Sequence, residues 1–350
     1  MTVAAPHAAA DRPSPTAPSA ASAVERLTDL LADDMARVNE TILARMDSSV
    51  ALIPQLARYI VASGGKRLRP LLTLAAARLC GYQGDHHVQL AAAVEFIHTA
   101  TLLHDDVVDE SEIRRGQASA HQIFGNKASV LVGDFLFARS FQLMVATGSV
   151  EILRILSNAA AIIAEGEVLQ LSIRNDVTAA EAAYLQVIEC KTAALFAAAC
   201  EVGPVIAGRP AAEAAALQAY GLNLGIAFQI IDDVLDYSAH QQTLGKAVGD
   251  DFREGKLTLP VILALQKAEA AGAAEELAFW QRVITDPERQ TEDDFDHAMT
   301  LIQRHDALAT SVSRAWAYAG KARDALNSFE VSALRDILLD TVDAAVDRSY

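Results

Sequence analysis

Apolar residues recur along this chain at intervals of three and four positions from residue 24 onward. The first such stretch contains Val24, Leu27, Leu31 and Met35, which is the spacing of one face of an amphipathic α-helix. Similar stretches follow to the C-terminus, and no run of alternating Val, Ile and Thr indicates a strand. The pattern therefore predicts an all-α fold.

Turn-forming residues divide this pattern into helices. Most breaks are short, so neighbouring helices are expected to run antiparallel. The exception is the polar segment from Ser238 to Gly255, which we interpret as a mobile lid. Residues 1–22 are rich in Ala, Pro and Ser and are expected to form a disordered leader. Residues 23–350 are predicted to form a single helical domain, because no long linker divides them.

One long segment, Ala214–Ile231, carries no charged residue. Its polar residues and glycines, and its continuation into two aspartates, favour a helix buried in protein over a helix in lipid. The N-terminus lacks the basic start and apolar core of a secretory signal. The three cysteines lie in apolar surroundings, which is typical of reduced thiols. We therefore expect a soluble, cytoplasmic protein.

The formal net charge of −16 limits the kinds of partner. So acidic a chain is a poor general ligand for nucleic acid or for an anionic membrane, and no nucleic-acid partner is expected. An anionic substrate would need local basic clusters and bound metal cations to reverse the field at its site.

The first motif with clear chemistry is Asp105-Asp106-x-x-Asp109, which follows an apolar stretch. On a helix these three carboxylates lie within about one turn of each other. Their repulsion would be relieved by a hard divalent cation such as Mg²⁺, which prefers oxygen ligands. Alone, the motif could equally be a solvated, acidic helix end.

The same spacing recurs in Asp232-Asp233-x-x-Asp236, again after an apolar stretch. Two copies are much harder to attribute to chance than one. If the two helices face each other, the six carboxylates would surround one cavity and hold several metal ions around one diphosphate. The predicted metal ligands are Asp105, Asp106, Asp109, Asp232, Asp233 and Asp236.

Basic residues lie where a diphosphate would need them. The segment Gly-Gly-Lys-Arg-Leu-Arg-Pro predicts a turn that opens a helix, with Lys66 and Arg69 at the helix N-terminus. Arg114 and Arg115 follow the first box and suit bidentate binding of phosphate. Alone, the first cluster could be an ordinary basic turn.

Together these motifs resemble those of the trans-isoprenyl diphosphate synthases, over roughly residues 25–350. The resemblance rests on the two boxes, the basic turn, Arg-Arg-Gly after the first box, Lys191-Thr192, Phe228-Gln229, and the lysines at 246 and 256. The segments Phe96–Ser111 and Ala164–Gln170 are most similar to bacterial octaprenyl and decaprenyl synthases, which make ubiquinone side chains.

The resemblance implies the isoprenoid synthase fold, with roughly ten core helices around a deep central cavity, and a homodimer. It implies about three Mg²⁺ ions per active site when diphosphate is bound. The reaction implied is head-to-tail condensation of isopentenyl diphosphate onto an allylic diphosphate such as farnesyl diphosphate, giving an all-trans C40–C50 product. The sequence leaves open whether release of so apolar a product involves transient contact with the inner face of the membrane.

The resemblance also assigns roles to residues. Those assigned to isopentenyl diphosphate are Lys66, Arg69, His98 and Arg115. Those assigned to the allylic diphosphate and its metal site are Arg114, Lys191, Thr192, Gln229, Lys246 and Lys256. The residues assigned to catalysis are Asp105, Asp106, Lys191 and Asp232.

Product length should depend on the depth of an apolar tunnel below the first box. Ala100 and Thr101 lie about one turn before the box and are small. In the resembling family a bulky aromatic residue there stops short products, so this tunnel is predicted to be open. Phe137, Phe141 and Met144 share one helix face and could form a deeper floor, or could be ordinary core residues.

Two other functions share parts of this pattern. A terpene cyclase on a related helical fold carries one aspartate box, but its second metal motif is of Asn/Ser/Glu type and it needs no isopentenyl diphosphate site. A regulatory subunit of a heteromeric synthase typically lacks one box or the basic residues. Because this chain has both boxes and the basic turn, we favour a Mg²⁺-dependent prenyltransferase that makes long chains.

Overall fold

The computed structural model describes residues 22–62, 65–114, 116–173, 175–178, 181–238 and 249–347. The first part of the chain forms α1 (Ala23–Leu30), α2 (Ala32–Arg45), α3 (Leu52–Ala62), α4 (Leu68–Leu79) and α5 (His86–Val108). A small antiparallel hairpin of β1 (Ile113–Arg114) and β2 (Gln117–Ala118) follows α5. Next come α6 (Ala120–Phe124), α7 (Asn126–Ala146) and α8 (Val150–Ile173).

The second part of the chain is also helical, which agrees with the predicted all-α fold. It begins with α9 (Glu181–Ile188), the π-helical turn η1 (Glu189–Ala193), α10 (Ala194–Ile206) and α11 (Ala211–Asp236). It continues with α12 (Asp250–Arg253), α13 (Leu259–Ala271), α14 (Ala274–Thr285) and the 3₁₀ turn η3 (Pro287–Arg289). It ends with α15 (Glu292–Arg304), α16 (Ala307–Ala325), the 3₁₀ turn η4 (Leu326–Ser328) and α17 (Ala333–Val346).

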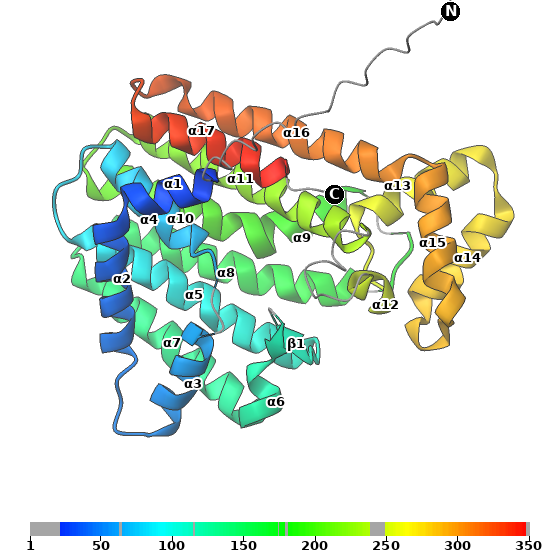
Figure 1. The fold of residues 1–350 in the computed structure, drawn as a ribbon, viewed down its shortest axis with the longest axis horizontal. Coiled ribbons are helices and arrows are strands. Elements are labelled where there is room, and N and C mark those ends of the chain that lie inside the picture. Colours follow the sequence, from blue (N-terminus) through cyan, green and yellow to red (C-terminus); the bar gives the residue numbers. More distant parts are fainter. Residues whose placement is uncertain are drawn as a thin grey trace, which may run out of the picture.

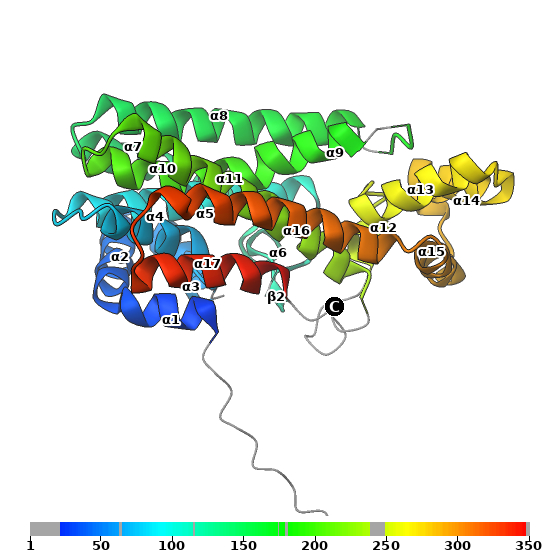
Figure 2. The same ribbon diagram turned by 90° about the horizontal axis from the view of Figure 1, so that it is seen from above.

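The long helices lie side by side in layers, as Figure 1 and Figure 2 show from two directions. α11 is central, because it packs against α10 on one side and α16 on the other, while α5 packs against α7 and α4. Helices α13, α14 and α15 form a lobe at one end of the molecule (Figure 1). Both α5 and α11 run toward that end, so the two aspartate boxes point in the same direction.

Two glycines let α11 approach its neighbours closely. A Cβ atom on Gly221 would lie 2.3 Å from the carbonyl oxygen of Phe196, and one on Gly225 would lie 2.7 Å from Cα of Ala193. Neither position has room for a side chain in so close-packed an interior. By length and composition both α7 and α11 could cross a membrane, but here α11 is packed between protein helices.

Two predicted segments fall largely outside the described residues. Of the leader predicted at 1–22, only Ser22 is described, and its hydroxyl accepts a 3.2 Å hydrogen bond from the backbone nitrogen of Glu25, which caps α1. Of the lid predicted between Ser238 and Gly255, residues 239–248 are not described. The rest of that segment contains the short helix α12.

A buried ion pair joins the N-terminal helices to the core. Asp34 on α2 accepts hydrogen bonds of 2.7 and 2.8 Å from Nε and an Nη of Arg78 on α4, and Nε2 of His87 on α5 lies 3.1 Å away. Burial alone would raise the pKa of Asp34, but the hydrogen bonds from Arg78 and His87 outweigh it and lower the pKa. This carboxylate is therefore charged at neutral pH and ties three helices together.

We expect Asp34→Asn to lower the free energy of unfolding by about 2 kcal/mol. This is less than the roughly 3–5 kcal/mol for breaking a fully buried pair, because the Arg78 side chain keeps 29% of its exposure. Since the folded-state pKa of Asp34 is lowered, the difference from the unsubstituted protein should be present at neutral pH and should shrink as the pH falls below about 4. Urea denaturation at pH 7 and at pH 3 measures both.

The matched control is Glu151→Gln, which breaks an exposed ion pair with Arg154 on α8. It should leave the free energy of unfolding nearly unchanged, because water screens an exposed pair. An equal effect of the two substitutions would contradict the role given to the buried pair.

Candidate active site

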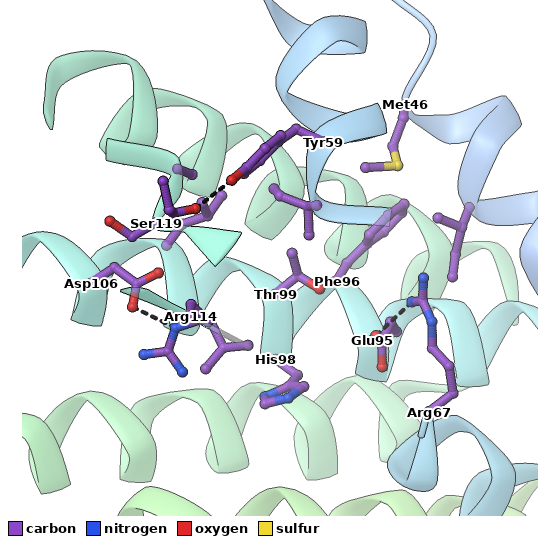
Figure 3. Close-up of a pocket in the computed structure, with 16 residues that line it drawn as sticks. Met46, Tyr59, Arg67, Glu95, Phe96, His98, Thr99, Asp106, Arg114 and Ser119 are labelled. Atoms are coloured by element: carbon purple, nitrogen blue, oxygen red, sulfur yellow. Dashed lines mark hydrogen bonds and ion pairs between the residues drawn. The ribbon is translucent and has the colours of Figure 1, made fainter. Parts of the chain in front are cut away.

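The first aspartate box lies at the end of α5. Asp105 and Asp106 belong to its last turn, and Asp109 is the residue that caps it. Asp106 is only 2% exposed, and its Oδ1 accepts a 2.5 Å hydrogen bond from Nε of Arg114 on β1 (Figure 3). The hairpin that follows the box therefore returns an arginine to the box itself.

Burial controls the charge of these carboxylates. It raises the pKa of Asp105 to about 7, although Lys191 opposes the shift. Burial also raises the pKa of Asp106, and here Arg114 opposes it. A cation bound at this box would favour the charged form of both carboxylates.

The second box occupies the last turn of α11 and is held by its neighbours. Oδ2 of Asp233 accepts a 2.6 Å hydrogen bond from the Tyr184 hydroxyl, and Oδ1 accepts a 2.8 Å hydrogen bond from Nε2 of Gln229. Oδ2 of Asp236 accepts a 3.0 Å hydrogen bond from the backbone nitrogen of Asp251. Two of the three carboxylates are thus oriented before any ligand arrives.

The carboxylates of the second box resist ionisation. Burial raises the pKa of Asp233 well above its usual range, and the negative charge of Asp251 adds to the shift. The same two causes raise the pKa of Asp236 to about 7. This box therefore carries its full negative charge only when a cation compensates it.

The π-helical turn η1 presents two of the predicted substrate-binding residues. Nζ of Lys191 lies 2.8 Å from Oε2 of Glu167 and 2.8 Å from Oε1 of Gln170, both on α8. The hydroxyl of Thr192 donates a 2.9 Å hydrogen bond to Oε1 of Gln229 on α11. Such π-helical turns are frequent at functional sites.

Four residues that hold this end of the fold together were not predicted from the sequence. Glu167 and Gln170 had a detectable signal, because two polar residues three positions apart in an apolar stretch of α8 share one face. Tyr184 and Asp251 had no such signal. Their roles arise because α9 and α12 fold back against the end of α11.

Lys256 lies between the two boxes. Its Nζ is 2.7 Å from Oε2 of Glu254 and 3.5 Å from Oδ1 of Asp251. Burial alone would lower the pKa of Lys256, but these two acids, together with Asp109, outweigh burial and raise it. Lys256 also lines a small cleft with Asp109 and Glu167. The Lys256 ammonium group therefore interacts both with Asp109 of the first box and with Asp251 and Glu254 beside the second box.

Neither of the two cavities at this end of the fold is lined by all six box carboxylates, which the sequence predicted to surround one cavity. Asp106 lines the larger cavity, Asp109 lines the small cleft, and the second box lines neither. Among the residues that the structure describes, no three His, Cys, Asp or Glu side chains are close enough to hold a metal ion. A metal ion here would need further ligands from phosphate or water, which is usual for Mg²⁺.

The basic turn before α4 is anchored on α5. Arg67 caps α4 with a left-handed φ of 48°, and one of its Nη atoms lies 2.5 Å from Oε1 of Glu95. An Nη of Arg69 lies 3.2 Å from Nε2 of His98, one turn further along α5, and the Arg69 guanidinium lies 4.4 Å from the centre of the Phe196 ring. The turn thus brings Arg69 and His98 together, as the predicted isopentenyl diphosphate site requires. Lys66 is exposed at its edge.

The larger cavity lies between α5, α2, α3 and the hairpin, and it encloses about 720 Å³ up to its open mouth. Figure 3 shows the pair of Asp106 and Arg114 at one end and the pair of Arg67 and Glu95 at the other. Between them its walls are largely apolar. They include Ile42, Met46, Ile60, Phe96, Leu102 and Leu103.

The residues predicted to set product length do not line this cavity. Ala100 is buried in the core and Thr101 is half-buried. Phe137 and Phe141 are half-buried with ring centres 5.4 Å apart, and Met144 is fully buried in the core. Two other predicted site residues, Arg115 and Lys246, lie outside the described residues.

Known proteins match this chain over most of its length. Residues 50–302 match the model of the family described as polyprenyl synthetase. An octaprenyl diphosphate synthase from Haemophilus influenzae is 45% identical over 93% of this chain and 98% of its own length.

Solved structures share the fold as well. A polyprenyl synthase from Caulobacter crescentus, complexed with calcium and isoprenyl diphosphate, is 54% identical with a TM-score of 0.88, covering 95% of this chain and 99% of that one. A decaprenyl diphosphate synthase from Rhodobacter capsulatus is 52% identical with a TM-score of 0.87, covering 93% and 98%. These matches confirm the predicted isoprenoid synthase fold and prenyltransferase class, and the chain belongs to the polyprenyl synthetase family.

Proposed function

We propose that this enzyme is an all-trans long-chain polyprenyl diphosphate synthase that makes a C40–C50 product for the ubiquinone side chain. It extends an allylic diphosphate such as farnesyl diphosphate with successive units of isopentenyl diphosphate. The observation that carries the proposal is the pair of aspartate boxes at one end of the fold, with Arg114, Lys191 and Lys256 beside them. The octaprenyl and decaprenyl relatives support the product class.

The donor set of the two boxes fits Mg²⁺. All six ligands are carboxylates, which a hard cation prefers, and the pKa of Asp105 and that of Asp236, both raised to about 7, would fall when a cation binds. We propose that about three ions bind together with the diphosphate, which completes their coordination. When bound, Mg²⁺ neutralises the charge that develops on the departing pyrophosphate.

The side chains around the boxes then act on the allylic substrate. Arg114 and Lys191 hold its diphosphate, and Lys256 covers it from the side of the second box. The allylic carbon–oxygen bond breaks with its electron pair on oxygen, and the double bond of isopentenyl diphosphate attacks the resulting cation. Loss of a proton to the released pyrophosphate leaves an allylic diphosphate five carbons longer. Apolar walls exclude water, which would give an alcohol instead.

Isopentenyl diphosphate binds at the basic turn, through Lys66, Arg69 and His98. The ion pair between Arg67 and Glu95 does not need to touch this substrate. It fixes the turn to α5 one helical turn away from His98, so Glu95 acts as a positioning residue for the phosphate-binding groups.

We propose a single domain that functions as a homodimer in the cytoplasm. The exposed faces of α7 and α8 carry Leu131, Val145, Val150 and Val168. Apolar residues concentrated on one surface are typical of a subunit interface, and a two-fold axis there would pair these helices with their copies.

Asp105→Ala and Asp232→Ala should each lower kcat by at least about 10²-fold, because each removes an oxygen ligand from the charge-stabilising site. Incorporation of labelled isopentenyl diphosphate into long-chain product, with farnesyl diphosphate and Mg²⁺, measures the effect on the purified chain alone. Asp293→Ala, which alters an exposed aspartate on α15, is the matched control. Near-normal turnover in either box variant would contradict the site. An inactive unsubstituted chain would favour a regulatory subunit.

Glu95→Gln should raise KM for isopentenyl diphosphate about tenfold, which corresponds to about 1.4 kcal/mol, and should leave KM for farnesyl diphosphate nearly unchanged. Initial rates with each substrate varied in turn separate the two constants. Asp34→Asn breaks the comparable buried pair at the opposite end of α4 and should change neither constant. A parallel rise in both would indicate general loss of structure instead of positioning.

Ala100→Phe should shorten the product to about C15–C20, because the ring would close the apolar path one turn below the first box. Mass spectrometry of the products measures chain length, and a thermal melt shows whether the buried ring is accommodated. Thr101→Phe repeats the test at a half-buried position. A stable variant of either kind that still makes the original product would overturn the tunnel assignment.

A further inference from the structure

Helix α3 differs in charge from the rest of this acidic chain. Between Ser48 and Gly84 the sequence contains no Asp or Glu, in a protein whose formal net charge is −16. The helix itself, Leu-Ile-Pro-Gln-Leu-Ala-Arg-Tyr-Ile-Val-Ala, has Arg58 as its one charged residue. Figure 1 shows it at the edge of the molecule, together with α6 and the end of α2, far from the lobe of α13 to α15.

The inner and outer faces of α3 have different surroundings. On the inner face Leu56 is fully buried, Tyr59 and Ile60 line the larger cavity, and the Tyr59 hydroxyl donates a hydrogen bond to the carbonyl of Ala118. Tyr59 also packs edge-on against Phe124 of α6, with ring centres 5.8 Å apart. These contacts fix α3 against α6 and leave its other side to solvent.

The elements at this edge of the molecule also expose large apolar residues. Their exposed fractions lie between 40% and 57%, and they are Leu43 of α2, Val50 and Leu52 at the start of α3, and Ile123 of α6. Arg58 and Lys127, at the start of α7 beside α6, are exposed with them. In segments 43–66 and 118–130 of the sequence, Asp47 is the one acidic residue. The same segments contain two further basic residues, Arg45 and Lys66.

We propose that this surface, formed by α3, α6 and the end of α2, docks on an anionic lipid bilayer. Exposed apolar side chains interspersed with cations on a short amphipathic helix are the composition that binds the headgroup region of anionic membranes. The chain as a whole carries a formal net charge of −16, so a surface with few acidic residues is the one favoured to face an anionic membrane. The charge pattern thus selects both the partner and the orientation.

This inference rests on the proposed function, because only a long polyprenyl product needs a bilayer as its acceptor. α3 is at once a wall of the cavity beside Asp106 and the centre of the docking surface, so the two lie on opposite sides of one helix. A second copy of the chain is the alternative occupant. Further along α7 and α8 the exposed residues Val145, Val150 and Val168 suit that role better, because the cations of the docking surface would repel each other in a pair of copies.

The test is co-sedimentation of the full-length enzyme with vesicles of phosphatidylcholine alone or with phosphatidylglycerol added. We expect binding to the anionic vesicles, weaker binding at high salt, and little binding to the neutral ones. The variant Leu52→Ser/Arg58→Glu/Lys127→Glu should bind the anionic vesicles at least about tenfold more weakly. Its product length and its rate in detergent should be unchanged.

The matched control, Val331→Ser/Lys267→Glu/Arg289→Glu, makes the same changes on exposed residues of other elements and should bind as the unsubstituted enzyme does. Equal loss in both variants would show a dependence on net charge alone and would overturn the proposal, as would equal binding to neutral vesicles. A change of oligomeric state in light scattering, without an effect on vesicles, would assign the surface to a second copy. Absence of long-chain product in detergent would instead refute the proposed function.

Discussion

Asp233 lies at the end of an apolar helix beside Asp232 and Asp236, with Asp251 close by, and keeping that much negative charge out of water is unfavourable. Neighbouring groups offset part of this unfavourable burial of charge. Tyr184 and Gln229 donate hydrogen bonds to Asp233, a backbone amide does so to Asp236, and Lys256 sits among the acids. The burial that these contacts do not offset raises the pKa values of Asp233 and Asp236, and a bound cation, as proposed above, would lower them again.

Helix α5 carries several of the predicted site residues along its length. Glu95 holds the basic turn, His98 meets Arg69 one turn later, and Asp106 reaches Arg114 two turns after that. Because these side chains share one helix, the distance between the two proposed diphosphate sites would be set by helical rise, at about 1.5 Å per residue. Close packing of α10 against α11 at Gly221 and Gly225 fixes the opposite wall in the same way.

Features that depend on local sequence could be predicted, and features that depend on packing could not. The all-α fold, the family, and the two helices that end in aspartates follow from helical spacing and from motifs. The roles of Tyr184 and Asp251 arise from helices distant in the sequence, and the separation of the box carboxylates depends on helix orientation. Likewise, spacing placed Ala100 and Thr101 one turn before the box, but it could not show that the larger cavity is lined by other residues of α5.

A π-helical turn holds one residue more than an α-helical turn, so η1 changes the rotation of α9 relative to α10. Lys191 and Thr192 are adjacent, and they contact α8 and α11 respectively, because successive residues of a helix point about 100° apart. The number of residues in η1 therefore affects the orientation of α9, whichever residue types the turn contains. Deleting one residue from η1 would rotate α9 relative to α10 and would turn Tyr184 away from Asp233 of the second box.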